Sequence, residues 1–132
     1  MILNQVTIPC TDYDASVEFY KAIGFVQIVD SPPRYARFES ADGCGATLSI
    51  HRTEESTAVG CVIYFDHGTA EALDAHVAEL KSKNMEFESE PVDQSWGWRE
   101  ARLKDPAGNE ICLMFAGDVR RFPAWRIDGR RS

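Results

Sequence analysis

The sequence predicts an α+β fold made of two tandem βαβββ modules. The order strand, helix, strand, strand, strand occurs twice along the chain, with a shift of about sixty residues, which is long enough for a whole supersecondary unit. The stops between elements also correspond. Gly24 and Phe25 follow the first expected helix as residues 84–87 follow the second, and the turn at Gly45 matches the turn at Gly108. Residue identity between the halves is weak, so the repeat is inferred from the pattern of elements.

The first module begins with a strand over residues 2–8, whose alternate side chains face opposite sides. Pro9 is expected to end this strand, and Asp12 can cap the helix that follows. Gly24 is a natural stop for that helix. Four apolar residues at helical spacing give it one apolar face: Tyr13, Val17, Tyr20 and Ile23.

Three further strands complete the first module. The first covers residues 25–29 and is broken by the proline pair at 32–33. The second covers residues 34–39 and the third residues 46–51, with a glycine-containing turn at 41–45 between them. The polar residues that follow, 52–58, are expected to link this module to the next.

The second module is expected to repeat this order, beginning with a strand over residues 59–65. Thr69 can cap the next helix and Asn84 can stop it. The apolar face of this helix is formed by Leu73, Val77 and Leu80. A short strand is then expected over residues 85–88.

A hairpin with a stiff loop closes the second module. Its strands are expected over residues 98–104 and 110–115. In the loop, Pro106 presets the φ angle of the second turn residue, and Gly108 can supply the positive φ that the chain needs to reverse. Asp105 can accept a hydrogen bond from its own downstream backbone and close the turn.

The composition favours a globular intracellular protein. Of its 132 residues 44% are hydrophobic, which suffices for a packed core. The net charge of −7 argues against a nucleic-acid partner, because phosphate contacts need a basic face. No apolar run is long enough to span a bilayer and no secretory signal is recognisable, so we expect no membrane partner and a cytoplasmic location. The four cysteines include no Cys-x-x-Cys pair and are expected to be free thiols.

The charge is distributed unevenly along the chain. Residues 117–132 contain five arginines against two aspartates, a local charge of +3, whereas the rest of the chain carries −10. Phe122, Pro123 and Trp125 interleave these arginines, which suggests docking. We therefore predict a single domain over residues 1–117, with modules over 1–52 and 58–117, and a basic, aromatic C-terminal extension over 118–132. This extension could cover the second cup or dock on a partner subunit, and docking is favoured.

Two motifs carry a resemblance to a known family. DASVEFY at residues 14–20, followed by Gly24 and Phe25, resembles the first helix of the vicinal oxygen chelate superfamily, which includes glyoxalase I, bleomycin-resistance proteins and extradiol dioxygenases. DPAGN at residues 105–109 is similar to the turn of that family. Together with the second helix, the likeness covers nearly the whole chain. It implies two modules whose mixed sheets curl into cups around a metal that acts as a Lewis acid, and a homodimer, as in many members.

The ligand positions of that family, carried over one by one, fall on an unusual set. The first falls on Gln5, which some glyoxalases share, and the fourth-strand position on Ser49, with His51 two residues further on the same side. The fifth- and eighth-strand positions fall on Cys61 and Cys112, where histidine and glutamate are usual. Two thiolates with His51 would suit Zn²⁺ on grounds of softness. The alternative, which we favour, is that both cysteines are small apolar residues of a cup without a metal.

Further residues are predicted to bind a ligand. The tryptophans would wall a pocket, and an arginine would clamp a carboxylate or phosphate. Core packing and cross-strand ion pairs explain the same side chains without any ligand. Glu110 is the candidate catalytic acid or base. The ligand-binding set comprises Gln5, Tyr35, Arg37, Phe65, Trp96, Trp98, Arg99 and Met114.

Two functions remain in competition. The favoured one is a glyoxalase-like protein that binds a small aromatic or anionic molecule in an apolar cup, without the standard glyoxalase metal site and with no favoured cofactor. The alternative is a metal-dependent lyase, isomerase or dioxygenase with a divalent metal (Zn, Ni, Mn or Fe) on Gln5, His51, Cys61 and Cys112. Glyoxalase I activity itself is not expected, because its metal and its glutamate base would both be missing. In a third option, an interaction module, the cup would be filled by its own side chains.

Overall fold

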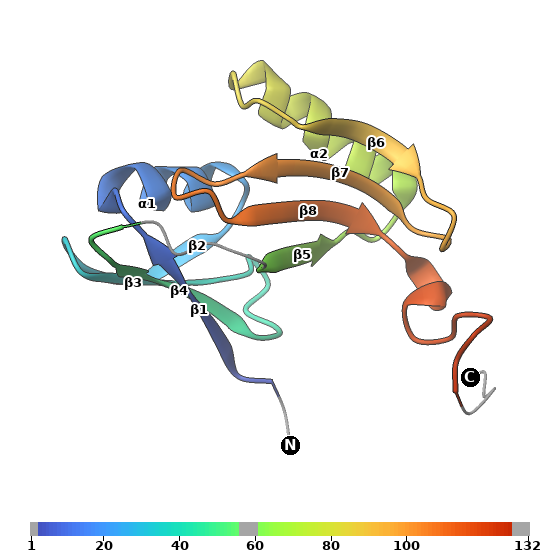
Figure 1. The fold of residues 1–132 in the computed structure, drawn as a ribbon, viewed down its shortest axis with the longest axis horizontal. Helices are drawn as coiled ribbons and strands as arrows, with labels where there is room; N and C mark the ends of the chain where they lie inside the picture. The colour runs from blue at the N-terminus through green and yellow to red at the C-terminus, as the bar shows by residue number, and fades with distance from the viewer. Residues whose placement is uncertain (1–2, 56–60, 128–132) are drawn as a thin grey trace. The chain divides into compact units, whose positions relative to one another are not determined.

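The computed structural model describes residues 3–55 and 61–127. The βαβββ order occurs twice (Figure 1), so the predicted α+β class with two modules is confirmed. The first series comprises β1 (Gln5–Cys10), α1 (Tyr13–Ala22), β2 (Val26–Ser31), β3 (Tyr35–Glu39) and β4 (Thr47–Arg52). The second comprises β5 (Val62–Asp66), α2 (Ala70–Ser82), β6 (Ser89–Asp93), β7 (Arg99–Lys104) and β8 (Glu110–Phe115), and a 3₁₀ helix η1 (Gly117–Arg120) follows.

Each series forms its own four-stranded sheet with the same strand order. The orders are β1-β4-β3-β2 and β5-β8-β7-β6. In the first sheet β1 runs parallel to β4, while β3 is antiparallel to both of its neighbours. The chain divides into two compact units: Met1–Cys61 with Lys104–Glu110, and Val62–Leu103 with Ile111–Ser132. The turn between β7 and β8 therefore belongs to the first unit.

Both predicted helix caps are confirmed. The side chains of Asp12 and Thr69 each accept a hydrogen bond, at 3.0 Å, from the backbone N–H three residues further on. Both helices also stop where expected, because the chain turns into the left-handed region just beyond them. Gly24 has a φ of 115° and Asn84 a φ of 66°, values that these two residue types tolerate best.

Ring contacts establish which face of the first sheet α1 covers. Tyr20 of α1 is fully buried, and its ring centroid lies 5.6 Å from that of Phe38 in β3. Because side chains alternate along a strand, Tyr35 and Arg37 point away from the helix.

An ion pair does the same for the second sheet. Arg99 of β7 lies 2.9 Å from Asp74 of α2, so the odd-numbered residues of β7 face this helix. Glu100 and Arg102 consequently point away from it. The buried residues of the second unit on the helix side include Leu73, Val77, Leu80, Ala101 and Leu103.

Two predicted strands were placed wrongly, and both errors involve proline. β1 continues through Pro9 to Cys10, because it is an edge strand and Pro9 needs no N–H on its open side. The strand expected at 85–88 lies at Ser89–Asp93, where Pro91 sits at a shift of register between β6 and β7 that removes the need for its donor. The expected start of the fifth strand, residues 59–60, lies outside the described residues.

The β7–β8 turn is closed by Asp105, as predicted. This buried carboxylate accepts hydrogen bonds from the backbone N–H groups of Ala107 and Asn109, at 2.9 and 2.8 Å. It also accepts one from the Tyr20 hydroxyl at 2.5 Å, while the Asn109 amide donates to the Pro9 carbonyl at 2.9 Å. Burial, together with the negative charge of Asp105, strongly raises the pKa of Tyr20. The DPAGN motif thus holds the turn against α1 and β1.

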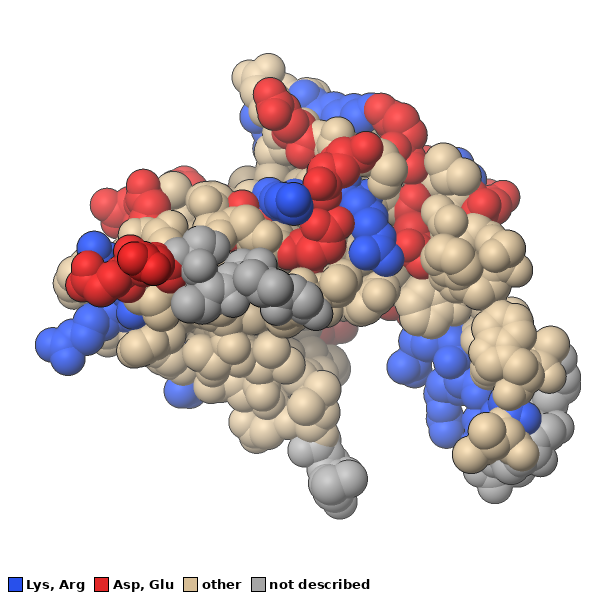
Figure 2. Space-filling model, viewed as in Figure 1, with Lys and Arg blue, Asp and Glu red and all other residues tan. Residues whose placement is uncertain are grey.

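The segment after β8 is basic and exposes apolar side chains. The guanidinium groups of Arg121 and Arg126 lie 5.5 and 4.9 Å from the ring centroid of Phe122. Trp125 is 64% exposed. In Figure 2 blue atoms gather over this segment. Arg130 and Arg131 lie outside the described residues.

None of the four cysteines, all of which lie in the described part of the chain, forms a disulfide. None of the helices within residues 3–55 and 61–127 has the length and apolar character that a membrane-crossing helix needs.

Candidate functional site

The face of the first sheet that points away from α1 carries a polar network, here called the polar face. Its members are Gln5, Thr7, Tyr35, Arg37, Thr47 and Ser49. The strand register brings them together, since Ser49 of β4 lies opposite Thr7 on one side and Arg37 on the other. Ser49 is fully buried beneath its neighbours, and its hydroxyl lies 2.6 Å from that of Thr7. Three adjacent strands thus present polar side chains to one place.

The Tyr35 hydroxyl is the acceptor at the centre of the polar face. It accepts hydrogen bonds from Arg37 Nε at 2.9 Å and from Gln5 Nε2 at 3.4 Å. Gln5 is itself oriented, because its Oε1 accepts from the Thr47 hydroxyl at 2.8 Å. Desolvation alone would raise the pKa of Tyr35, but hydrogen bonding with Ser49 and Arg37 and the positive charge of Arg37 lower it overall. The network therefore favours negative charge on this oxygen.

Arg37 has unused donors. The half-buried guanidinium contacts Tyr35 through Nε and lies 5.6 Å from the centroid of that ring. Its two terminal nitrogens have no acceptor within the described part of the chain. An arginine of this kind can bind a carboxylate or phosphate group through two parallel hydrogen bonds.

The corresponding face of the second sheet, here called the aromatic face, is different. It consists of Val62, Tyr64, Trp98, Cys112 and Met114. The Tyr64 and Trp98 rings meet edge to face with centroids 5.9 Å apart. Cys112 and Met114 are fully buried, as is expected of small or flexible apolar residues.

The arginine of the aromatic face is already paired. Arg102 lies 3.1 Å from the buried carboxylate of Glu100 and 5.7 Å from the centroid of the Tyr64 ring. Glu100 also accepts a hydrogen bond from Trp96 Nε1 at 2.8 Å. Burial works against the charged form of Arg102, but Glu100 holds its pKa above the usual value. The charges of Arg102 and Glu100 on this side of the second sheet are thus paired with each other.

The predicted ligand-binding residues do not all share a face. Gln5, Tyr35 and Arg37 come together on the polar face. Arg99 lies on the α2 side of its sheet, where Asp74 and Asp93 hold its guanidinium at 2.9 and 3.1 Å. Of the remaining four, Trp98 and Met114 belong to the aromatic face. Trp96 contacts that face through its hydrogen bond to Glu100. Phe65 alternates with Tyr64 along β5 and so lies on the α2 side. Strand alternation separates Arg99 and Phe65 from the others.

The predicted metal ligands have dissimilar surroundings. Gln5 lies opposite Thr47 whereas His51 lies opposite Pro9, four residues or about 13 Å further along the strands. Cys61 is exposed and Cys112 is buried in the apolar cluster. No group of three or more His, Cys, Asp or Glu side chains in the described residues is placed to hold a metal ion.

The polar face offers no anionic donor at the positions where the family holds a divalent metal. Its family ligand positions carry the Gln5 amide and the Ser49 hydroxyl, both already hydrogen-bonded and neither anionic, so the first sheet does not fit such an ion. The four-residue metal set stays a prediction. So does the catalytic role of Glu110, which begins β8 and is half-buried.

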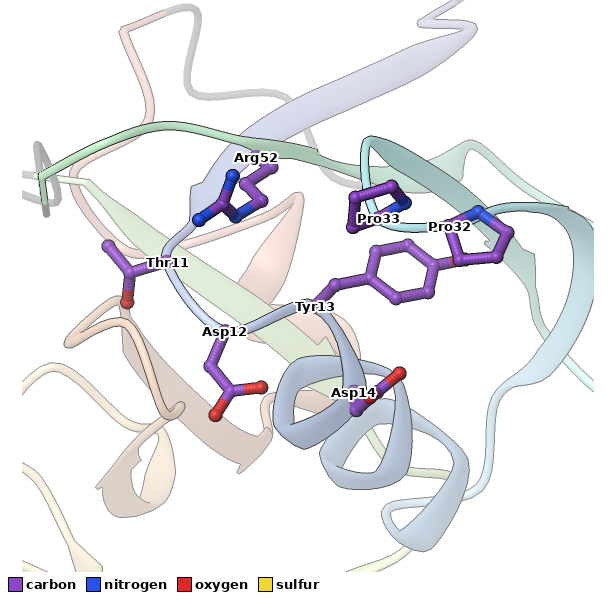
Figure 3. A pocket seen from close by; sticks show the side chains of 7 residues that line it. All are labelled: Thr11, Asp12, Tyr13, Asp14, Pro32, Pro33 and Arg52. Atoms are coloured by element: carbon purple, nitrogen blue, oxygen red, sulfur yellow. The ribbon is translucent and has the colours of Figure 1, made fainter.

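A pocket of about 560 Å³ opens on the first unit, between the start of α1, the β2–β3 turn and the end of β4 (Figure 3). Tyr13 forms one wall beside the proline pair; its hydroxyl donates to the Asp30 carboxylate and, at 3.3 Å, to the Tyr35 carbonyl. Burial and the hydrogen bond to Asp30 raise the pKa of Tyr13 to about 12. The pocket is lined by Thr11, Asp12, Tyr13, Asp14, Pro32, Pro33 and Arg52. The sequence analysis missed it, and its one signal was the break at Pro32-Pro33.

Comparison with known proteins identifies relatives of this fold. The model of the Glyoxalase/Bleomycin resistance protein/Dioxygenase superfamily matches residues 2–113. No curated protein matches the chain in sequence. Among solved structures, a glyoxalase/bleomycin resistance protein/dioxygenase from Nocardioides has a TM-score of 0.73 at 22% identity, covering 88% of this chain and 83% of that one.

Two further solved structures are similar to the same extent. A glyoxalase/bleomycin resistance protein/dioxygenase family enzyme from Burkholderia phytofirmans PsJN has a TM-score of 0.73 at 22% identity, covering 88% of this chain and 99% of its own. Lactoylglutathione lyase from Agrobacterium tumefaciens has a TM-score of 0.71 at 20% identity, covering 86% of this chain and 92% of its own. At these identities the likeness establishes a shared fold.

Proposed function

The chain belongs to the Glyoxalase/Bleomycin resistance protein/Dioxygenase superfamily, and from this premise we propose that it binds a small anionic molecule on the polar face of its first sheet. The observation that carries the proposal is Arg37. Its Nε is held by the Tyr35 hydroxyl, while its terminal nitrogens lack an acceptor among the described residues. A half-buried guanidinium oriented in this way is suited to a carboxylate or a phosphate.

The surroundings of Arg37 specify the ligand further. Tyr35 offers a ring for stacking and a hydroxyl with a lowered pKa, and Ser49 and Gln5 add fixed polar groups. A small molecule that carries one anionic group next to a ring or a hydroxyl would satisfy them together. The apolar lining expected from the sequence does not describe this face, so the recognition we propose is polar.

Binding is favoured over metal-dependent catalysis because of the donor set. An amide and a hydroxyl occupy the family ligand positions of the first sheet, and both are engaged with neighbours. The metal-dependent lyase, isomerase or dioxygenase therefore stays the alternative, and we derive no step for it. The proposal includes a cytoplasmic location, which is supported by four cysteines that form no disulfide, because reducing compartments keep thiols reduced.

Calorimetric titration with four anionic probes tests the proposal: inorganic phosphate, benzoate, salicylate and phenylphosphonate. We expect at least one to bind, and Arg37→Gln to weaken it by about tenfold or more, because a charge-assisted bidentate contact is lost. Arg34→Gln is the matched control, since Arg34 is exposed in the β2–β3 turn. Failure of all four probes to bind, or equal weakening by both variants, would contradict the proposal.

We also propose that two copies form a homodimer in which the C-terminal segment docks. The support is a basic segment with Trp125 and Ile127 exposed on a chain that is otherwise acidic. Removal of such side chains from water usually requires a partner surface. Light scattering after size exclusion should show a dimer that Trp125→Ser weakens, while Val92→Ser, another exposed apolar position, leaves it intact. A monomeric wild type would exclude the homodimer.

A further inference from the structure

Two histidines of the second unit lie in contact, away from the polar face. His67 follows β5 and His76 belongs to α2, and both side chains are half-buried. His67 Nε2 lies 2.8 Å from His76 Nδ1, and the ring centroids are 5.0 Å apart. We propose that this pair binds a divalent transition-metal ion of the Cu²⁺, Ni²⁺ or Zn²⁺ class.

The hydrogen bonds of His67 set its tautomer. Its Nδ1 lies 2.9 Å from the carbonyl oxygen of Met114. A carbonyl can only accept, so Nδ1 carries a proton, and in the neutral ring the lone pair on Nε2 points at His76. Metal-binding histidines are oriented in this way, with the second ring nitrogen donating to a carbonyl or carboxylate. His67 therefore already has the tautomer and the support of a ligand.

His76 requires a change of tautomer. In the metal-free pair its Nδ1–H donates to His67 Nε2. Movement of that proton to Nε2 of His76 turns its Nδ1 lone pair toward the same point, and neither ring loses a net proton. Zn–N bonds of the usual length hold two nitrogens about 3.3 Å apart in a tetrahedral site, so the rings must separate by about half an ångström from their 2.8 Å distance.

The proposed site is open. No third His, Cys, Asp or Glu side chain in the described residues completes a cluster around the pair. Water would therefore fill the remaining positions, and the ion would be exchangeable. Imidazole nitrogens favour Cu²⁺ over Ni²⁺ and Zn²⁺ in the usual order of affinity. The pair shares no residue with the four positions carried over from the family, and it does not depend on anion binding at Arg37.

The test uses tag-free protein in a Cys44→Ser/Cys61→Ser background, which removes the two exposed thiols. Equilibrium dialysis should show one Cu²⁺ per chain, and the electron paramagnetic resonance spectrum should show coupling to two nitrogens. His67→Gln and His76→Gln should each weaken binding by about tenfold or more. His51→Gln serves as the comparison, because it would lose binding only if the ion sat on the metal set carried over from the family; position 51 holds the third and last histidine of the chain.

Two results would overturn the inference. Loss of binding in His51→Gln but not in the other two variants would place the metal elsewhere, and equal binding by all three variants would show adventitious association. Nitrogen NMR of the Cys44→Ser/Cys61→Ser protein, in which all three histidines are present, makes the test independent of how the histidine variants fold. On addition of Zn²⁺ the ring nitrogens of His67 and His76 should shift while those of His51 do not, and unshifted resonances of the pair would equally reject the site.

Discussion

The two sheets have one strand order but opposite linings. On the first, hydroxyl and amide side chains form a network around Tyr35, and Arg37 keeps donors available. On the second, apolar and aromatic side chains pack together, and Arg102 is held by the buried Glu100. The backbone topology determines which positions face away from each helix, whereas the residues at those positions determine what can bind there. Family membership alone therefore does not identify the ligand.

The β3–β4 and β7–β8 turns occupy equivalent positions in the two sheets, but they differ in the burial of their aspartates and in how far their contacts reach. Asp42, in the β3–β4 turn, is exposed and accepts hydrogen bonds from Ser40 and from the backbone of Cys44. Asp105, in the β7–β8 turn, is buried and accepts from both backbone and side chains, including Tyr20. Both carboxylates shape their own turns, but only the second also holds separate elements together.

The largest expected effect is the difference in stability between variants of these two turns. Asp105→Ala should lower the free energy of unfolding by about 3–5 kcal/mol, because it leaves several buried hydrogen-bond donors without an acceptor. Asp42→Ala should leave the denaturation midpoint almost unchanged, since water replaces its contacts. Urea unfolding followed by circular dichroism measures both. Similar midpoints for the two variants would show that the buried turn is not a structural tie.

The second prediction compares the arginines of the inner strands. Arg102→Met should cost about 3 kcal/mol, because Glu100 would stay buried without its cation. Arg37→Met should cost only about 1 kcal/mol, the value of one ordinary hydrogen bond. The double variant Glu100→Gln/Arg102→Met should recover much of the loss. If the two single variants were equally destabilised in urea, the contrast between paired and available arginine would fail.

The third prediction exchanges residues between the inner strands β4 and β8. Cys112→Ser places a hydroxyl in an apolar cluster and should cost about 1–3 kcal/mol. Ser49→Cys removes the contact with Thr7, which lies 2.6 Å away, and should cost about 1 kcal/mol. Thermal unfolding of both variants measures the difference. A stabilising effect of Cys112→Ser would mean that the aromatic face is wet.

The smallest effect concerns two tyrosines of the first unit. The pKa of Tyr35 is lowered and that of Tyr13 is raised to about 12. As the pH rises through its folded-state pKa, Tyr35 should therefore stabilise the native state, a gain that is lost as the pH falls again. Tyr13 should contribute below about pH 10 and lose its contribution as the pH approaches 12.

Ultraviolet titration of phenolate absorbance checks this order. Tyr35→Phe should remove an early step and Tyr13→Phe a late one, and Arg37→Gln should delay the ionisation of Tyr35. An unchanged early step in Tyr35→Phe would contradict the electrostatic role assigned to Arg37.

Much of the fold could be predicted because it depends on local signals. Asp12 and Thr69 cap helices through groups three residues away, and Asp105 closes a turn within its own pentapeptide. Alternation along β3 places Tyr35 and Arg37 on one face, but only the contact of Tyr20 with Phe38 showed which face that is. The placement of β6 failed because whether Pro91 ends a strand depends on the register with β7, which is not local.

By itself, the sequence determined the repeated order of elements, the helix ends and the superfamily, since these follow from residues close together in the chain. The tertiary structure decided which side chains have partners. Arg99 pairs with Asp74 of α2 and Arg102 pairs with Glu100, whereas Arg37 has donors available for a ligand. His67 lies within hydrogen-bond distance of His76. The reason is physical: the strength of a polar group depends on its burial and its nearest charges, and both are set by chain segments far away in sequence.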